Sequence, residues 1–184
     1  IQERQADLSQ KFSENALDAT DAFAYFAAES ELDGVPDDVR QAARAAAQAD
    51  GRDGFKLTLK MPCYLPMMQF ATSSALRQRL YKAYVTRASD QAEGEAARFD
   101  NGALIREILA LRQEEATLLG YGNFGEVSVV PKMADSPAQV VGFLRDLARR
   151  ARPHAEKDIA DLRSFATREL GIADVAALRP KLLG

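Results

Sequence analysis

The chain has 184 residues, of which 47% are hydrophobic and 28% are charged, as in a globular protein of one ordinary domain or two small ones. One Cys and one His are too few for an internal disulfide or for the ligands of an ordinary zinc site. The net charge of −3 argues against a general attraction to nucleic acid or anionic lipid. No uncharged stretch reaches the ~20 residues that span a bilayer. We therefore expect neither a nucleic-acid partner nor a membrane partner.

The first predicted element is an amphipathic helix. Apolar residues recur at spacings of three and four from Leu8 to Phe26, which is the period of one helix face. This pattern alone carries the helix to about Ala28, although the aromatic residues Phe23 and Tyr25 also suit a strand. Because the chain begins with Ile inside this pattern, we expect it to be a piece of a longer protein.

A second helix and a strand follow. Pro36 suits the first helical position, and the Ala-rich run after it ends at Gly51. From Phe55 to Lys60 apolar and polar residues alternate, which predicts a half-buried strand that needs a partner. The uncharged stretch from Met61 to Leu76 contains two prolines, and we interpret it as a buried connector.

Two more helices have recognisable start signals. One begins at Ser73 or Ser74, and the next begins at Asp100 or Asn101, because these side chains can accept hydrogen bonds from a first helical turn. From their spacing, we expect the buried residues of these two helices to be Leu76, Leu80, Ala83, Tyr84, Leu104, Ile108, Leu111 and Leu118.

The last predicted helix has the clearest start. Ser136 and Gln139 form a capping box, and the helix extends to a stop at Gly171. Pro153 lies inside it and should kink or break it, at a cost of ~3 kcal/mol. The segment 124–130 before this helix is rich in valine and predicts a strand. The residues of the last helix that we expect to be buried are Val140, Leu144 and Leu147.

Residues Gly120 to Gly125 match the G-x-G-x-x-G pattern of dinucleotide-binding loops. That use requires a strand before the glycines. A predicted helix precedes them instead, so we interpret Gly120 as a helix end followed by a turn. Extension to Val127 matches the phosphate loop of kinases, but no His-Arg-Asp or Asp-Phe-Gly sequence supplies the base and magnesium ligands.

Other residues that could carry chemistry fit structural roles better. His154 is expected on an exposed helix face, and Cys63 has no cationic neighbour in sequence to activate it. Glu107 and Glu114 share a helix face that we interpret as solvated, and an enzyme using these two residues with His154 ranks last among the alternatives. We name no catalytic, cofactor-binding or metal-binding residue. Intrahelical ion pairs are expected for Arg145, Arg149, Arg150 and Arg152.

Six segments carry a family resemblance through their order and spacing: KFSENALDAT (11–20), FKLTLKMPCYLPMM (55–68), YKAYVTRASD (81–90), ILALRQEEATLLGYGNF (108–124), FLRDLARRARP (143–153) and LRSFA (162–166). Together they resemble the thimet oligopeptidase family of zinc peptidases, and its bacterial members most. The match covers about Lys11 to Gly171.

The resemblance implies a two-lobed helical peptidase whose deep channel admits short peptides and excludes folded proteins. In that family an H-E-x-x-H helix and a later Glu hold the zinc, and the Glu of the motif acts as general base on a zinc-activated water. This sequence contains no H-E-x-x-H, and His154 corresponds to none of those residues. We therefore expect a cytoplasmic parent peptidase that needs zinc, and a fragment that binds no zinc and is inactive alone.

The resemblance also refines the fold. It implies a mainly α, multi-helical N-terminal lobe fragment over residues 1–184, with a small antiparallel strand pair at about 23–28 and 55–60. The first helix then ends near Thr20, and segment 124–130 is helical. Residues 172–184 depart from the family pattern, and we leave their conformation open.

Two kinds of partner follow from this interpretation. The parent binds short peptide substrates, and the missing C-terminal catalytic lobe covers a surface whose exposure lets the fragment self-associate. The alternative is a self-contained helical module that binds a peptide or protein and has no enzymatic parent.

Overall fold

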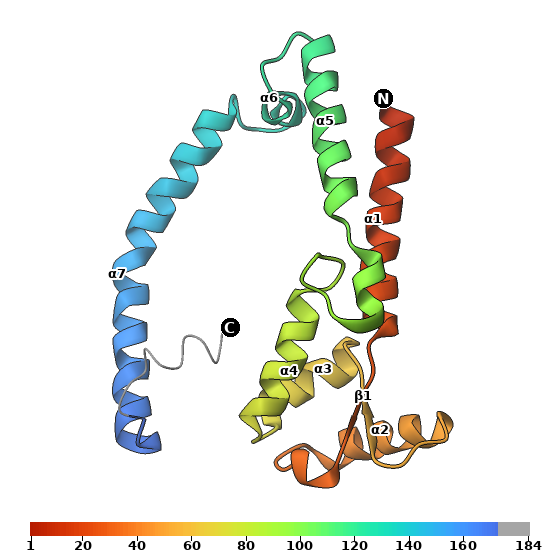
Figure 1. Cartoon of the computed structure of the whole chain (residues 1–184). Helices are drawn as coiled ribbons and strands as arrows, with labels where there is room; N and C mark the ends of the chain where they lie inside the picture. The colour runs from red at the N-terminus through yellow and green to blue at the C-terminus, as the bar shows by residue number, and fades with distance from the viewer. Residues whose placement is uncertain (173–184) are drawn as a thin grey trace. The chain divides into compact units, whose positions relative to one another are not determined.

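The computed structural model describes residues 1–172, which form helices joined by short turns and two short strands (Figure 1). This confirms the mainly α fold class. Apart from Ile172, the predicted tail 172–184 lies outside the described residues. In chain order the elements are α1 (Gln2–Ala22), β1 (Tyr25–Ala27), η1 (Glu29–Glu31), α2 (Asp37–Ala49), β2 (Phe55–Leu57), α3 (Met61–Phe70), α4 (Ser74–Val85), η2 (Gly94–Phe99), α5 (Gly102–Leu118), α6 (Phe124–Val129) and α7 (Pro137–Leu170).

The described chain divides into two compact units. The first unit runs from Gln2 to Ile108 and contains both strands, and the second begins at Leu109. Helix α5 starts in the first unit and ends in the second. That the two units belong to one lobe stays a prediction.

The two strands pair antiparallel, with Tyr25 opposite Leu57. They lie within the segments 23–28 and 55–60, so the predicted strand pair is confirmed, although both strands are shorter than expected. Helix α1 ends before them at Ala22. The prediction from apolar spacing alone, which continues the helix through strand β1, is therefore wrong. Pairing provides hydrogen-bond partners for the backbone groups of both segments, and aromatic residues are favoured in β-strands.

The hydrophobic core of the first unit is built from the strand pair and from helices α2, α3 and α4. Leu57 from β2, Met67 from α3 and Leu80 from α4 are fully buried. The ring of Tyr64 stacks on that of Tyr84, with 4.3 Å between their centroids. Each fully buried side chain of this size contributes ~1.5–3 kcal/mol to stability, so this core fixes α4 against the strands.

Residues 61–70 form helix α3, so the interpretation of 61–76 as a connector is wrong for most of its length. Pro62 lies in the first turn, where a backbone N–H has no partner within the helix. Pro66 lies inside the helix and removes one backbone hydrogen bond. Burial of apolar side chains such as Met67 offsets that loss, which sequence spacing does not reveal.

The starts of α2 and α4 show how well capping signals predict helix ends. The Ser73 hydroxyl accepts a hydrogen bond from the Leu76 amide at 3.2 Å and caps α4, as predicted. Pro36 lies at the N-cap of α2, one position before the predicted one. Gly51 follows the end of α2 with a φ of +67°, which favours glycine.

A buried pair of asparagines joins α1 to the start of α5. Nδ2 of Asn15 donates to Oδ1 of Asn101 at 2.8 Å, and Nδ2 of Asn101 donates to the Phe12 carbonyl oxygen at 3.0 Å. The Asn101 side chain is therefore bound to α1. Of the two predicted starts of α5, Asp100 provides the side-chain contact, because its Oδ1 accepts a hydrogen bond from the Gly102 amide at 2.8 Å.

Segment 124–130 is helical, so the strand predicted from its valines is wrong and the expectation from the family resemblance is confirmed. Asn123 caps α6 by accepting a hydrogen bond from the Glu126 amide at 3.2 Å. The Glu126 carboxylate in turn accepts one from the Gly122 amide at 2.9 Å. These reciprocal bonds favour a helix start over the β preference of valine.

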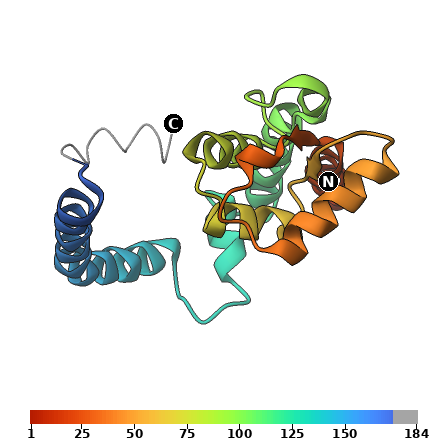
Figure 2. The same cartoon turned by 90° about the horizontal axis from the view of Figure 1, so that it is seen from below.

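Helix α7 is one uninterrupted element although Pro153 lies inside it. The Ser136 hydroxyl accepts a hydrogen bond from the Gln139 amide at 3.2 Å, as predicted, whereas the Gln139 side chain accepts from the Asp135 amide rather than from Ser136. Gly171, with a φ of +64°, ends the helix as predicted. Of the predicted kink or break at Pro153, the kink is confirmed: Figures 1 and 2 show that the helix changes direction near its middle, because bending relieves the clash of the proline ring.

Three leucines that we expected to be buried lie exposed. Leu118 is 72% exposed, Leu144 54% and Leu147 52%. That part of the prediction is wrong for the chain as described. Periodicity shows which side of a helix is apolar, whereas burial requires another element to cover that side.

Candidate functional site

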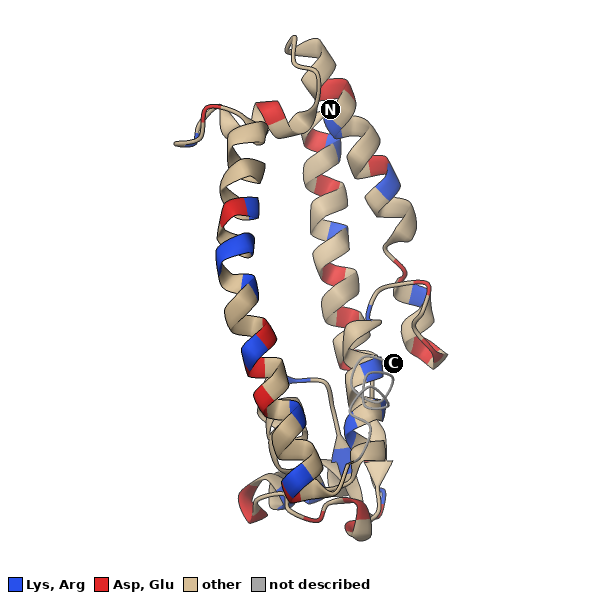
Figure 3. Cartoon of the chain, turned by 90° about the vertical axis from the view of Figure 1, so that its left-hand side faces the viewer, with Lys and Arg blue, Asp and Glu red and all other residues tan. Residues whose placement is uncertain are grey.

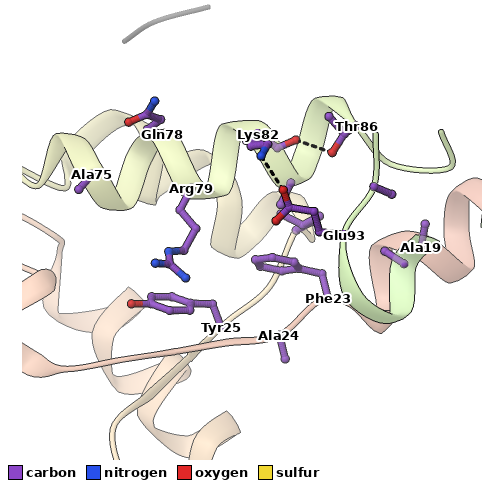
Figure 4. Close-up of a pocket in the computed structure, with 14 residues that line it drawn as sticks. Ala19, Phe23, Ala24, Tyr25, Ala75, Gln78, Arg79, Lys82, Thr86 and Glu93 are labelled. Atoms are coloured by element: carbon purple, nitrogen blue, oxygen red, sulfur yellow. Dashed lines mark hydrogen bonds and ion pairs between the residues drawn. The ribbon is translucent and has the colours of Figure 1, made fainter. Parts of the chain in front are cut away.

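A cavity of about 590 Å³ lies in the first unit beside α4 (Figure 4). Its size falls in the range of ~300–1,000 Å³ that is common for ligand pockets. The end of α1 and the start of β1 form the wall opposite α4, through Ala19, Phe23 and Tyr25. One side of α4 forms the other wall, with residues at helical spacings of three and four: Ala75, Gln78, Arg79, Lys82, Ala83 and Thr86.

The core of the first unit positions both walls. Leu76 and Leu80 anchor α4 in the core, which leaves the neighbouring side of the helix to face the cavity. Pairing of β1 with β2 holds Tyr25 opposite Leu57, and so fixes the second wall. The cavity is thus built on packed elements rather than on a loop alone.

Arg79 and Tyr25 are the central pair of the cavity. The Arg79 guanidinium lies over the Tyr25 ring, 4.5 Å from its centroid, in the arrangement that Figure 4 shows. The Tyr25 hydroxyl donates a hydrogen bond to Oε1 of Glu31 at 2.8 Å. This bond, with a contribution from burial, raises the pKa of Tyr25, so the phenol is neutral at pH 7.

Lys82 and Glu93 form the charged pair at the edge of the cavity. The Lys82 ammonium donates to Oε1 of Glu93 at 2.6 Å. This hydrogen bond, and then the positive charge of Lys82, lower the pKa of the Glu93 carboxyl. The two charges compensate each other. Arg79, in contrast, forms no ion pair with any residue in the described range, so the cavity carries a net positive charge.

The lining favours binding over catalysis. Among the described residues that line the cavity there is no His, Cys or Ser, and the amine of Lys82 is held in an ion pair with Glu93. An uncompensated guanidinium beside apolar side chains instead suits an anion attached to an apolar group.

The carboxylates and the histidine considered from the sequence lie elsewhere. Glu107 accepts two hydrogen bonds from Arg4, at 2.7 and 3.0 Å, which lower the pKa of its carboxyl. Glu114 is exposed on α5, and His154 is exposed on α7 as expected. Within residues 1–172 no group of three His, Cys, Asp or Glu side chains is placed to hold a metal ion.

The glycines of the G-x-G-x-x-G segment join two helices. Gly120, with a φ of +81°, follows the end of α5, and the Tyr121 amide donates to the Ala116 carbonyl oxygen at 2.8 Å. Helix α6 begins at Phe124, and a helix rather than a strand precedes the glycines. The interpretation as a helix end and turn is confirmed.

Three of the four arginines that we expected to form ion pairs within α7 do so. Arg149 and Arg150 both contact Asp146, the latter at 2.7 Å, and Arg152 pairs with Glu156 at 2.8 Å. Figure 3 shows basic and acidic residues mixed along this helix. A mixed, solvated face of this kind is a poor phosphate site.

Cys63 lies beside the core of the first unit. Its Sγ accepts a hydrogen bond from the Thr58 amide at 3.4 Å, which links α3 to the end of β2. The thiol is free and half-buried.

Helix α7 also carries a series of exposed apolar side chains, which we call the α7 apolar face. Two sets of three residues lie 18 positions apart, and 18 residues make five turns, so both sets lie on one side of the helix. The exposed fractions of these side chains run from 43% to 61%. The α7 apolar face consists of Val141, Leu144, Leu147, Ile159, Leu162 and Phe165.

The reasoning from sequence missed the cavity residues Tyr25, Arg79 and Glu93. A partial signal exists, because Arg79 lies four residues from both Ala75 and Ala83 and so belongs to a stripe of small residues. The opposite wall comes from a segment far earlier in the chain, however, and spacing within one helix cannot show it.

Within the described residues, no helix combines the length and the apolar character needed to cross a membrane.

Comparison with known proteins places the sequence among peptidases. The profile of Peptidase family M3 matches residues 67–179. Oligopeptidase A of Salmonella typhimurium is 46% identical over 176 residues, which are 95% of this chain and 26% of that protein. Oligopeptidase A of Haemophilus influenzae is 41% identical over 174 residues, or 94% of this chain and 25% of that protein. Saccharolysin of Saccharomyces cerevisiae is 28% identical over 142 residues. The chain therefore spans about a quarter of the length of these oligopeptidase A relatives.

Proposed function

The chain belongs to peptidase family M3, and on this basis we propose that it is the N-terminal, channel-wall portion of a cytoplasmic, zinc-dependent oligopeptidase that hydrolyses short peptides. The observation that carries the proposal is the 46% identity to oligopeptidase A over 95% of this chain. Because the chain spans 26% of that relative, we assign the catalytic residues to sequence outside these 184 residues.

The residues present do not fit a zinc site. The family resemblance assigns the metal to an H-E-x-x-H helix and a later Glu, whereas this chain has one His and no such sequence. In the described part of the chain, no cluster of potential ligands replaces them. No catalytic step follows from these residues, and the chain's own contribution is to bind and enclose the substrate.

The α7 apolar face supports the proposal that another part of the same protein packs against this chain. Soluble monomers rarely expose large contiguous apolar surfaces, and such surfaces mark contact sites. The exposed residues of this face include Phe165, at 50%, and Leu162, at 61%. We assign this face to contact with the C-terminal catalytic lobe, and we expect the chain to self-associate when that lobe is absent.

The experiment begins with the gene. We expect an in-frame H-E-x-x-H sequence several hundred residues beyond Gly184. The longer product should cleave a quenched fluorescent peptide, and a chelator should abolish that activity until zinc is restored. The 184-residue chain should cleave nothing at the same concentration.

Two results would contradict the proposal. A stop codon directly after this segment would favour the self-contained binding module, for which the cavity beside α4 would be the binding site. Chelator-sensitive peptide cleavage by the 184-residue chain alone would place the catalytic centre within it.

A further inference from the structure

Arg79 is an arginine in a cavity without a carboxylate partner. Its guanidinium carbon lies over the Tyr25 ring, 4.5 Å from the centroid. Stacking uses the face of a guanidinium, while its five N–H donors lie along the edge. No acidic side chain within residues 1–172 forms an ion pair with this edge. The edge is therefore available to an incoming acceptor.

The other polar groups of the cavity do not compete for that acceptor. Lys82 is bound to Glu93 at 2.6 Å, so its charge is compensated. The Tyr25 hydroxyl donates its hydrogen bond to Glu31 at 2.8 Å, and a phenol is neutral at pH 7 even before the pKa of Tyr25 is raised by this bond. Arg79 is thus the single uncompensated charge among the described residues that line the cavity.

Several apolar side chains line the cavity together with Arg79. Phe23 and Leu59 contribute large side chains from the strand side, and Ala75 and Ala83 leave space on α4 at four residues before and after Arg79. A suitable ligand therefore has a negative group with an apolar group directly attached. The C-terminal residue of a peptide has this form, because its carboxylate and its side chain share one carbon atom. The carboxylate of an Asp or Glu residue lies instead at the tip of a side chain.

We propose that the cavity beside α4 binds the C-terminal carboxylate of a short peptide, with Arg79 as the carboxylate-binding residue and the apolar lining as the pocket for the last side chain. The choice of a peptide as ligand rests on the proposed function, whereas the choice of a carboxylate rests on the cavity alone. The carboxylate accepts paired hydrogen bonds from the guanidinium edge, which is the strong, geometrically specific form of this contact.

Isothermal titration of the 184-residue chain tests the proposal with three peptides. The first is Ala-Ala-Phe with a free C-terminus, the second is its C-terminal amide, and the third is Ala-Glu-Phe amide, whose only carboxylate lies on a side chain. We expect saturable binding of the first, and roughly tenfold weaker binding of both amides, because each loses the charge-assisted contact with Arg79.

Two variants test the assigned residue. Arg79→Gln should weaken binding of the free-acid peptide roughly tenfold and leave binding of its amide unchanged. Arg98→Gln is the matched control, because Arg98 is also exposed and also stacked on an aromatic ring, at 4.7 Å from the centroid of Phe99, but does not line the cavity. It should bind all three peptides as the unchanged chain does. Far-UV circular dichroism verifies that both variants are folded, and Arg79→Lys, which keeps the charge, should retain part of the affinity.

The proposal is overturned if the free-acid peptide shows no saturable binding, if the two Ala-Ala-Phe peptides bind equally, or if Arg79→Gln binds like the unchanged chain. Tight binding of the Ala-Glu-Phe amide would overturn the choice of a peptide terminus in favour of a side-chain carboxylate. These outcomes leave the proposed peptidase untouched, because cleavage by the longer gene product tests it separately. Conversely, an inactive longer product would refute the peptidase and leave carboxylate binding standing.

Discussion

Replacement of Asn101 by Ala should strongly destabilise the first unit, although it removes a single uncharged side-chain amide. Asn101 is 2% exposed, and its side chain forms hydrogen bonds with Asn15 at 2.8 Å and with the Phe12 carbonyl oxygen at 3.0 Å. Removal of the amide leaves Nδ2 of Asn15 without its partner and takes a second hydrogen bond from the Phe12 carbonyl oxygen, which keeps its bond within α1. A buried polar group left unsatisfied costs ~1–3 kcal/mol and a hydrogen bond contributes about 1 kcal/mol, so we expect a loss of about 2–4 kcal/mol in the free energy of unfolding.

Urea unfolding monitored by near-ultraviolet circular dichroism is the appropriate assay. The chain has no Trp, four of its five tyrosines lie in the first unit, and the rings of Tyr64 and Tyr84 are stacked there, so the tyrosine signal reports mainly on that unit. Gln10→Ala is the control, because Gln10 lies on α1, the helix that Asn101 contacts, but is exposed and bonds only to the exposed Glu14. It should change stability by less than about 0.5 kcal/mol.

A double-mutant cycle with Asn15→Ala separates the pair from its surroundings. If the two side chains act together, the double variant should lose less than the sum of the single losses, by about 0.5–3 kcal/mol. A loss below about 0.5 kcal/mol for Asn101→Ala, or strictly additive losses, would refute the assignment of this pair as the link between α1 and α5.

Two further predictions concern the strand pair and α7. Gly54→Ala should destabilise the chain by about 1–3 kcal/mol in urea unfolding, because the φ of Gly54 is +90° and a Cβ there would lie 2.7 Å from the Ala27 carbonyl oxygen. Gly142→Ala, at an open helical position of α7, should instead stabilise by ~0.5–1 kcal/mol, and the same sign for both variants would contradict the reasoning. The double variant Leu144→Glu, Leu162→Glu should lower the apparent mass of the chain in light scattering at high concentration, because it places charge on the α7 apolar face. If the chain without these substitutions is strictly monomeric at high concentration, that result would count against self-association through this face.

The sequence predicted helix starts better than it predicted burial. Ser73 and Ser136 were identifiable because a cap is a local interaction between a side chain and an amide three residues later. Segment 61–70 was misjudged because the energetic penalty of a proline is local, whereas the packing that outweighs it is not.

Strand β1 shows the same difference between local signals and long-range contacts. Apolar spacing favours continuation of α1 through Tyr25, and only the partner strand near Leu57 decides against it. The family resemblance supplied that partner, as it supplied the helical state of 124–130. Neither periodicity nor the resemblance pointed to Arg79, since its cavity arises where α4 meets β1.

The zinc content of the two gene products tests the central claim most directly. After purification and desalting, elemental analysis should find one zinc ion per molecule of the longer product and none in the 184-residue chain, whose single His cannot hold the metal alone. One tightly held zinc ion per 184-residue chain, or a longer product that hydrolyses peptides without any metal, would contradict the account.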